Sequence, residues 1–239
     1  MEWSQALDEV RKFTFKIITP QGSGTGFLIT LREQGVCGVA TAYHVIEHAF
    51  SWEEPIKLLH TFTNRTILLR VPDRYILPNP TNDAAIVMFM KGDLDVDGNL
   101  LTLAPEDKYL RPGNEIAWAG YPAIAPDEFS FFNGHVSCYL NSANAYLVDG
   151  VAINGVSGGP TFTMIDSQVY VIGIVSAYIP NRITGESLPG VCFVTAVKPF
   201  HEFMKDIASL EQAKTKAEIA EPSTASDMVP ATAPRVPRA

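Results

Sequence analysis

Three residues of the sequence have types that act together in nucleophilic catalysis. Residues 155–160 (GVSGGP) place Ser157 between glycines, while His44 follows an apolar stretch and Asp83 precedes one. A serine hydroxyl is a weak nucleophile unless a base lies within hydrogen-bond reach and a third group fixes the tautomer of that base. The flanking glycines allow successive backbone N–H groups to point into one space, as an oxyanion requires. Together these residues predict an acyl-transfer centre.

Two alternatives compete with this interpretation. The serine segment also matches the GxSxG nucleophile elbow of the α/β-hydrolases, which needs a helix directly after the serine and the chain order Ser, Asp, His. Here Pro160 and β-prone residues follow, and only His201 lies downstream, so the order His, Asp, Ser excludes the elbow. Asp73 is a rival to Asp83, but it lies between a proline and an arginine in a turn-like context.

Composition excludes several other classes of function. The chain has 239 residues, 46% hydrophobic and 18% charged, with a net charge of −8. This acidic balance argues against a nucleic-acid partner, whose phosphates demand a basic face. No apolar run is long enough to cross a membrane, and residues 1–4 do not begin a secretory signal, so we expect no membrane partner.

Three widely spaced cysteines form neither a disulfide framework nor a metal-ligand pair. They are predicted to be free thiols, which fit a cytoplasmic protein. No ligand cluster indicates a cofactor or a metal. The glycine-rich residues 22–26 lack the lysine and the following helix of a phosphate loop, so a strand-edge turn is predicted there.

Many short β-rich segments, separated by Gly, Pro, Asn and Asp, predict an all-β protein built as a sandwich or barrel. Helical spacing of apolar residues predicts a short helix at residues 2–11 and a second from residue 198 to about 217. A polar stretch at residues 91–105 divides the strands into two sets, which indicates two barrels. The predicted strands are residues 13–19, 24–30, 36–41, 56–62, 66–71, 84–90, 115–119, 129–139, 145–148, 161–165, 169–175 and 190–196.

The predicted organisation has four parts. Residues 1–12 form an N-terminal amphipathic helix, residues 13–104 a first barrel with the His and Asp, and residues 105–200 a second barrel with the Ser. Residues 201–239 form a C-terminal helix and a tail. The tail, rich in Pro, Ala, Ser and Thr from residue 221, is predicted to be disordered.

Five ordered segments resemble the trypsin-like serine proteases of the chymotrypsin fold, and within them the HtrA (Do/Deg) branch. The glycine-rich opening strand, the histidine segment, the aspartate segment, the serine loop and the strand after it all match. These segments are GSGTGFLI at 22–29, TAYHVI at 41–46, NDAAIV at 82–87, AINGVSGGP at 152–160 preceded by Asp149, and VIGIVS at 171–176. The likeness covers about residues 13–200.

The resemblance implies two six-stranded antiparallel β-barrels with the reactive residues in the cleft between them. It makes His44 the general base and acid, Asp83 its orienting carboxylate and Ser157 the nucleophile. It assigns the oxyanion donors to the backbone N–H groups of Gly155 and Ser157. No cofactor is implied.

The resemblance also locates the substrate-binding residues, which are Val151, Ser176, Ala177 and Tyr178. The base of the primary specificity pocket falls at Val151, which has no carboxylate to pair with a basic substrate side chain. We therefore expect cleavage after small or medium apolar residues.

The sequence departs from the family at three places. Val156 replaces the aspartate or asparagine usual before the nucleophile, Asn154 replaces a common proline, and the roughly forty residues after Ala196 are too few for a PDZ-type domain. Three functions remain open. The first is a serine endopeptidase acting on a protein or peptide, which could be one dedicated partner. The second is a catalytically silent peptide-binding module, and the third is a non-peptidase hydrolase using the same residues.

Overall fold

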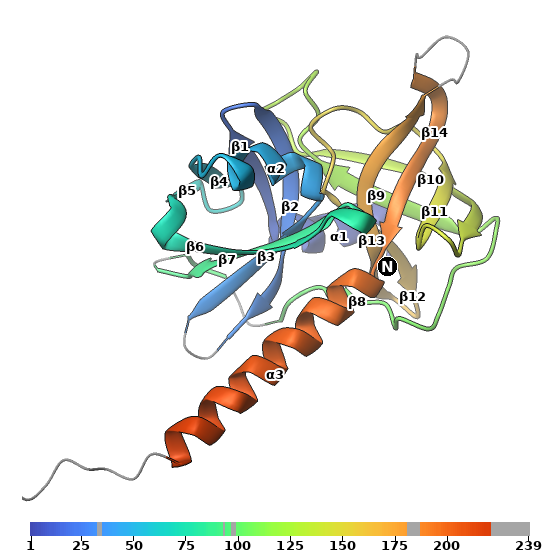
Figure 1. Ribbon diagram of the computed structural model, residues 1–239. Helices are drawn as coiled ribbons and strands as arrows, with labels where there is room; N and C mark the ends of the chain where they lie inside the picture. Colours follow the sequence, from blue (N-terminus) through green and yellow to red (C-terminus); the bar gives the residue numbers. More distant parts are fainter. Residues whose placement is uncertain (33–34, 93, 97–98, 181–186, 221–239) are drawn as a thin grey trace, which may run out of the picture. The chain divides into compact units, whose positions relative to one another are not determined.

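The computed structural model describes residues 1–32, 35–92, 94–96, 99–180 and 187–220. Two antiparallel sheets carry nearly all of the regular structure, which confirms the predicted all-β class (Figure 1). The predicted tail from residue 221 lies outside the described residues. Contacts divide the chain into one unit from Met1 to Phe203 and another from Met204 onward.

The first sheet has seven strands in the order β5-β4-β1-β2-β3-β7-β6. Over the residues described, no pairing closes its two edges, so it is an open half-barrel. Its strands are β1 (Thr14–Thr19), β2 (Gly22–Leu31), β3 (Val36–Thr41), β4 (Ile56–His60), β5 (Arg65–Leu69), β6 (Arg74–Asn79) and β7 (Ala84–Met90).

The second sheet has the order β12-β9-β10-β11-β14-β13-β8, and a further pairing of β12 with β13 closes six of its strands into a barrel. The short β8 adds to β13 in parallel. The strands are β8 (Thr102–Leu103), β9 (Glu115–Gly120), β10 (Ser130–Leu140), β11 (Ala145–Asp149), β12 (Pro160–Ile165), β13 (Gln168–Pro180) and β14 (Ser187–Ala196).

The predicted pair of six-stranded barrels is thus one closed barrel and one open sheet. Strand β6 was not predicted because Pro78, Asn79 and Pro80 have the composition of a turn. The structure places β6 at the edge of the first sheet, where a proline removes no needed ladder hydrogen bond.

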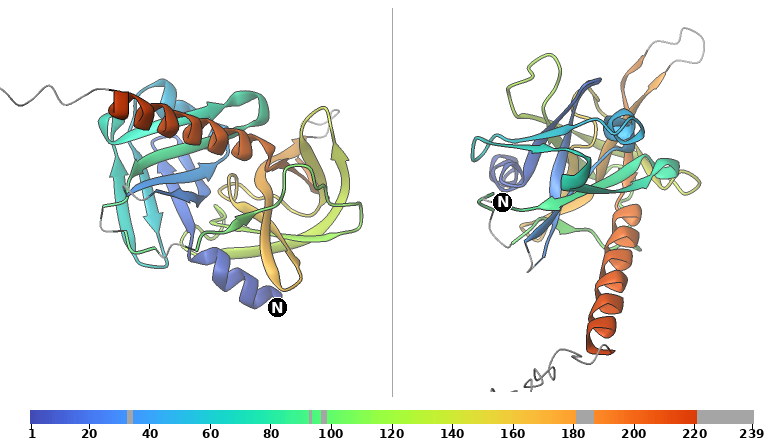
Figure 2. Two further views of the ribbon diagram at one scale, coloured as in Figure 1. Left: turned by 90° about the horizontal axis from the view of Figure 1, so that it is seen from below. Right: turned by 60° about the vertical axis from the view of Figure 1, so that its left-hand side comes forward.

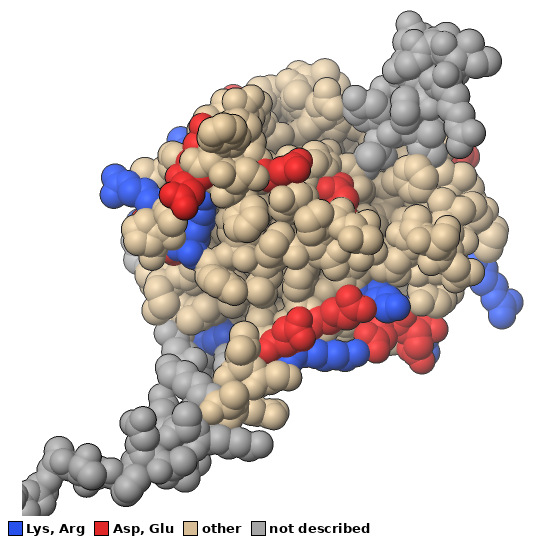
Figure 3. Space-filling view, in the orientation of Figure 1, with Lys and Arg blue, Asp and Glu red and all other residues tan. Residues whose placement is uncertain are grey.

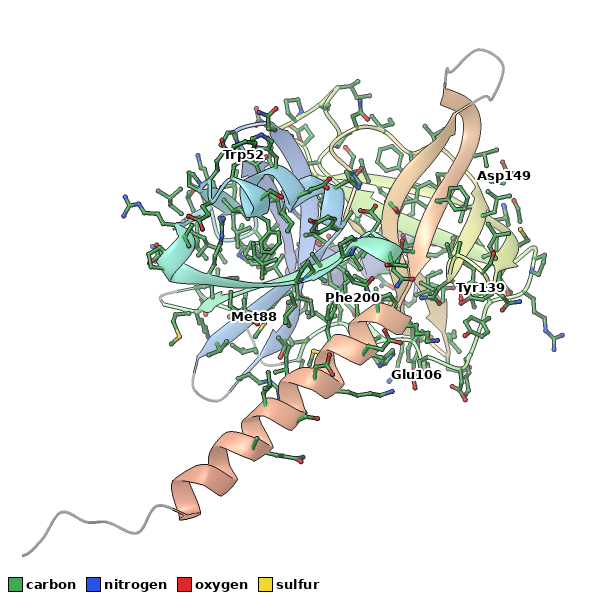
Figure 4. The ribbon with its side chains drawn as sticks, viewed as in Figure 1. Trp52, Met88, Glu106, Tyr139, Asp149 and Phe200 are labelled. Carbon is green, nitrogen blue, oxygen red and sulfur yellow. The ribbon has the colours of Figure 1, made fainter. Side chains whose placement is uncertain are left out.

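In the part of the chain that the structure describes, three α-helices accompany the sheets. Helix α1 (Trp3–Arg11) lies against the second sheet, where the Trp3 ring packs 5.9 Å from Phe131 and 6.0 Å from Phe162 between ring centroids (Figure 2). Helix α2 (Tyr43–Ser51) follows β3 and was not predicted. Helix α3 (Lys198–Ala220) has the buried Phe200 in its first turn, and the ring of Phe200 packs edge-on against Phe27 at 6.5 Å between ring centroids (Figure 4).

Large apolar side chains fill the interior of the unit from Met1 to Phe203. The largest that are fully buried include Phe15, Phe27, Trp118, Phe162 and Phe200. On the face seen in Figure 3, the described Lys and Arg residues are scattered among Asp and Glu and form no continuous basic patch.

Candidate active site

A left-handed turn directs the Asp83 carboxylate toward helix α2. Asp83 has φ 47° and ψ 47°, a conformation that aspartate tolerates better than most residues. The preceding 3₁₀ turn (Pro80–Asn82) is held by the Asn79 side chain, which accepts the Asn82 backbone N–H at 3.2 Å. From the second sheet, the Thr195 hydroxyl donates to the Asn82 carbonyl oxygen at 3.0 Å. The carboxylate therefore stands on a turn fixed from both sheets.

Asp83 caps helix α2 and at the same time binds the His44 ring on that helix. Its backbone oxygen accepts the Tyr43 N–H at 3.2 Å, and its Oδ1 accepts the His44 N–H at 2.9 Å. Its Oδ2 lies 2.8 Å from His44 Nδ1. The residue before the helix, Ala42, has no side chain that could cap it. One carboxylate thus fixes both the backbone and the ring of His44, and leaves Nε2 as the free ring nitrogen.

The Asp83 carboxyl is held in its ionised form. Burial by itself raises its pKa, but the hydrogen bonds and charge of His44, together with the Ser176 hydroxyl, outweigh this effect and keep the pKa below its ordinary value. Ser176 Oγ donates to Asp83 Oδ2 at 2.5 Å. A carboxylate that stays ionised is suited to stabilise a positive charge on the imidazole beside it.

Ser157 lies on a tight turn between β11 and β12 that closely approaches the first sheet. Gly158, at φ +82°, has no room for a Cβ, which would lie 2.2 Å from the Thr25 carbonyl oxygen. The Thr25 N–H donates to the Ser157 carbonyl oxygen at 2.8 Å. Val156, the residue before Ser157, is fully buried. Burial of the Val156 side chain therefore helps to hold the loop that carries Ser157 in place.

Two peptide planes in this loop turn their carbonyl oxygens away from the pocket. The Asn154 oxygen accepts the Ala123 N–H at 2.6 Å, and the Val156 oxygen accepts the Gly159 N–H at 2.8 Å. In a trans peptide the N–H points opposite to the C=O, so the N–H groups of Gly155 and Ser157 face the other side. These are the two predicted oxyanion donors, and neither donates to another backbone group of the described residues.

His44, Gly155 and Ser157 line one cavity of about 220 Å³. His44 lies on α2, which follows a strand of the first sheet, whereas Gly155 and Ser157 lie in a loop of the second sheet. Over the described residues the Ser157 hydroxyl makes no hydrogen bond to His44. Such contacts are often long in the absence of substrate. The other lining residues are Thr19, Gln21, Gly22, Ser23, Val45, His48 and Asn154.

The predicted substrate-binding residues are not gathered in the same way. The Val151 side chain is half exposed, and its carbonyl oxygen accepts the buried Trp118 indole N–H at 3.2 Å. Ser176 uses its hydroxyl to support Asp83 rather than leaving it free. Ala177 and Tyr178 continue strand β13, opposite Phe193 and Cys192, but their side chains lie outside what the structure describes.

The contribution of Thr25 was not predicted from the sequence. Its fully buried hydroxyl donates to the Gly155 carbonyl oxygen at 2.7 Å and accepts the Tyr121 N–H at 3.1 Å. It therefore joins the serine loop to the end of β9. No residue-type signal distinguishes such a threonine from the others of a β-strand.

The competing residues lie in other settings. Asp73 accepts the Arg70 N–H at 3.2 Å within a local 3₁₀ turn (Val71–Asp73). Strand β12 begins at Pro160, so no helix follows the serine loop as a nucleophile elbow would need. Residues 22–26 are the first part of strand β2 (Gly22–Leu31) and not the predicted strand-edge turn. Among the described residues, no group of three or more His, Cys, Asp or Glu is placed to hold a metal ion.

Solved structures with a similar fold include Deg5 and a serine endoprotease. Deg5 aligns with a TM-score of 0.60 at 20% identity, over 84% of this chain and 94% of that one. The serine endoprotease from Yersinia pestis aligns with a TM-score of 0.63 at 16% identity, over 86% of this chain and 66% of that one. The chain has the fold of the trypsin-like serine proteases.

A third similar structure is Rv3671c from M. tuberculosis H37Rv, as an inactive serine-to-alanine mutant. It aligns with a TM-score of 0.57 at 15% identity, over 85% of this chain and 90% of that one. No family model matches the sequence, and no curated protein matches it. In the described residues, no helix is long and apolar enough to span a bilayer.

Proposed function

We propose that the chain is a serine endopeptidase in which Ser157 is the nucleophile, His44 the general base and acid, and Asp83 the orienting carboxylate. The observation that carries the proposal is that the Asp83 carboxylate binds both the His44 backbone N–H, at 2.9 Å, and the His44 ring Nδ1, at 2.8 Å. His44 and Ser157 line the same pocket. The fold shared with serine proteases supports it.

In this mechanism His44 Nε2 accepts the hydroxyl proton as Ser157 Oγ attacks the substrate carbonyl carbon. The N–H groups of Gly155 and Ser157 bind the oxyanion that forms. His44 then gives its proton to the leaving amine, and the C–N bond breaks to leave an acyl-enzyme. Water, activated by the same imidazole, hydrolyses the ester and regenerates the serine. The Asp83 carboxylate stabilises the imidazolium throughout.

The substrate is proposed to be a protein or peptide cleaved after a small or medium apolar residue, because Val151 provides no carboxylate for a basic side chain. We propose a cytoplasmic location. Its support is the three free cysteines, of which Cys37 and Cys192 are buried, so that burial raises their thiol pKa values to about 11 and about 12. Such thiols are mostly protonated and unreactive.

A second candidate, a catalytically silent peptide-binding module, is favoured by one observation. The Ser157 hydroxyl has no hydrogen bond to His44 over the described residues, so the nucleophile and base are not joined at rest. A peptide would then add as a strand along the sheet edge near Val175 and Tyr178.

Labelling with a fluorophosphonate, read by intact-mass spectrometry, separates the two candidates. We expect one adduct on the wild type, none on Ser157→Ala, and an unchanged adduct on Ser23→Ala, whose serine lines the same pocket. Peptides and simple esters with apolar acyl residues then test whether amide bonds are cleaved. A folded wild type without an adduct would remove the endopeptidase proposal and leave the binding module.

A further inference from the structure

Lys16 belongs to the first sheet, yet its ammonium group is enclosed against a connection of the second. Its side chain is 9% exposed, and Nζ donates to the Pro126 carbonyl oxygen at 2.7 Å. Asp127 Oδ1 lies 3.5 Å away on a side chain that is 91% exposed, so water screens this ion pair. Enclosing an ammonium against a neutral carbonyl costs free energy relative to water, so stability alone does not explain this contact.

The connection that Lys16 contacts, residues 121–129 between β9 and β10, forms the support of the Gly155 peptide. Its Ala123 N–H holds the Asn154 carbonyl oxygen at 2.6 Å. A Cβ on Gly155 would lie 2.4 Å from the Tyr121 oxygen and 2.9 Å from the Ala123 nitrogen. The orientation of the Asn154–Gly155 peptide, and so of the Gly155 N–H, therefore depends on where this connection lies.

Three contacts from the first sheet hold the connection. At its beginning, the Tyr121 N–H donates to the Thr25 hydroxyl at 3.1 Å, and the Tyr121 hydroxyl lies 2.6 Å from that of Thr61, just after β4. Further along, Lys16 holds Pro126. Ala123 lies between these two anchors. Removal of the Lys16 contact leaves only the Tyr121 contacts to hold the connection against the first sheet.

We propose that Lys16 is a positioning residue for the oxyanion site. By holding Pro126 it keeps the 121–129 connection against Gly155 and keeps the Asn154 carbonyl oxygen turned away from the pocket. This inference rests on the proposed function, because it requires an oxyanion to form at Ser157. Lys16 touches no reacting atom, and its effect is confined to steps in which the oxyanion develops.

The test compares Lys16→Met, which keeps the length of the side chain but removes its donors, with Lys16→Arg, which keeps a donor. Lys57→Met is the matched control, because Lys57 is an exposed lysine on β4, next to β1. Each variant is assayed with a p-nitrophenyl ester of an acyl peptide ending in alanine. Each is also titrated with a peptide trifluoromethyl ketone, which forms an oxyanion on the serine, and with the peptide alcohol of the same sequence, which forms none.

We expect Lys16→Met to lower kcat by about ten- to a hundredfold, less than the ~10²–10³ that follows loss of an oxyanion donor. Affinity for the ketone should fall by a similar factor, while KM and affinity for the alcohol stay within about twofold of the wild type. Lys16→Arg should recover most of the loss, and Lys57→Met should behave as the wild type.

If Lys16→Met fails to fold, Thr61→Val serves as a second variant. It should also lower kcat and affinity for the ketone while leaving KM and affinity for the alcohol unchanged, with a smaller effect. The inference is overturned if these variants keep wild-type kcat and ketone affinity, or if ketone and alcohol affinities fall together. A wild type that is inert toward both the ester and a fluorophosphonate would refute the proposed function, and the role of Lys16 with it.

Discussion

The two sheets supply different kinds of groups to the candidate site. The open first sheet contributes side chains, His44 at the start of α2 and Asp83 before β7, whose geometry depends on hydrogen bonds between them. The closed second barrel contributes Ser157 and two peptide planes, whose directions depend on where their carbonyl oxygens are held. The first half of the site is thus sensitive to the identity of its side chains, and the second to the space around its backbone.

Removing one residue from each half of the candidate site should have the largest effect. His44→Ala and Ser157→Ala should each lower kcat by on the order of 10⁶, and the double variant should lose little more, because the two act as one unit. Steady-state and single-turnover kinetics on a cleavable peptide measure this. Losses that multiply in the double variant would mean that the two halves act independently.

Within the first half, Asp83→Asn should lower kcat by about 10⁴. An amide can still accept the His44 backbone N–H, but its NH₂ group facing the ring favours the wrong tautomer. Asp73→Asn is the matched control, because among the described residues Asp73 binds its own local turn and not a histidine. Equal losses for the two variants would argue against Asp83 as the orienting carboxylate.

Within the second half, Gly155→Ala should lower kcat by ~10²–10³, because the added Cβ displaces the peptide that carries an oxyanion donor. Gly113→Ala is the control for backbone strain. Gly113 has φ +88°, close to the +91° of Gly155, but a Cβ there meets nothing within 4 Å. If Gly113→Ala reduced kcat as much, strain rather than the direction of the peptide would explain the effect.

The smallest expected effect is a change in how the free energy of unfolding depends on pH. Because the folded-state pKa of Asp83 is depressed, its ionised form stabilises the fold above the unfolded-state pKa of about 4, and this contribution disappears as pH falls through the folded-state value. The difference in free energy of unfolding between wild type and Asp83→Asn should be largest near neutral pH and shrink below about pH 4. Urea denaturation at pH 7 and pH 3 measures it, and a difference independent of pH would contradict the ion pair.

The all-β class was predictable because strands β1, β3, β7, β9 and β12 have apolar patterns bounded by turn residues. Helix α2 was not, since its capping group is Asp83, about forty residues away from Ala42 in the sequence. Strand β6 was hidden by Pro78 within it and Pro80 just after it.

For the candidate site, the sequence indicated the residue types but not their supports. The hydroxyl of Ser176 on Asp83, and that of Thr25 on the Gly155 carbonyl, join positions that are distant along the chain. Local patterns carry no information on such pairings. The positions of Val151, Ala177 and Tyr178 relative to a substrate remain predictions.

The cap that Asp83 places on α2 would link the proposed catalytic activity to local unfolding. A helix of nine residues is too short to be stable by itself, so its first turn depends on this carboxylate. When the first turn frays, the His44 amide is released together with the hydrogen bond that orients its ring. Protection of that single amide against hydrogen exchange therefore reports the fraction of molecules ready to react, and heat should abolish activity before the sheets lose their structure.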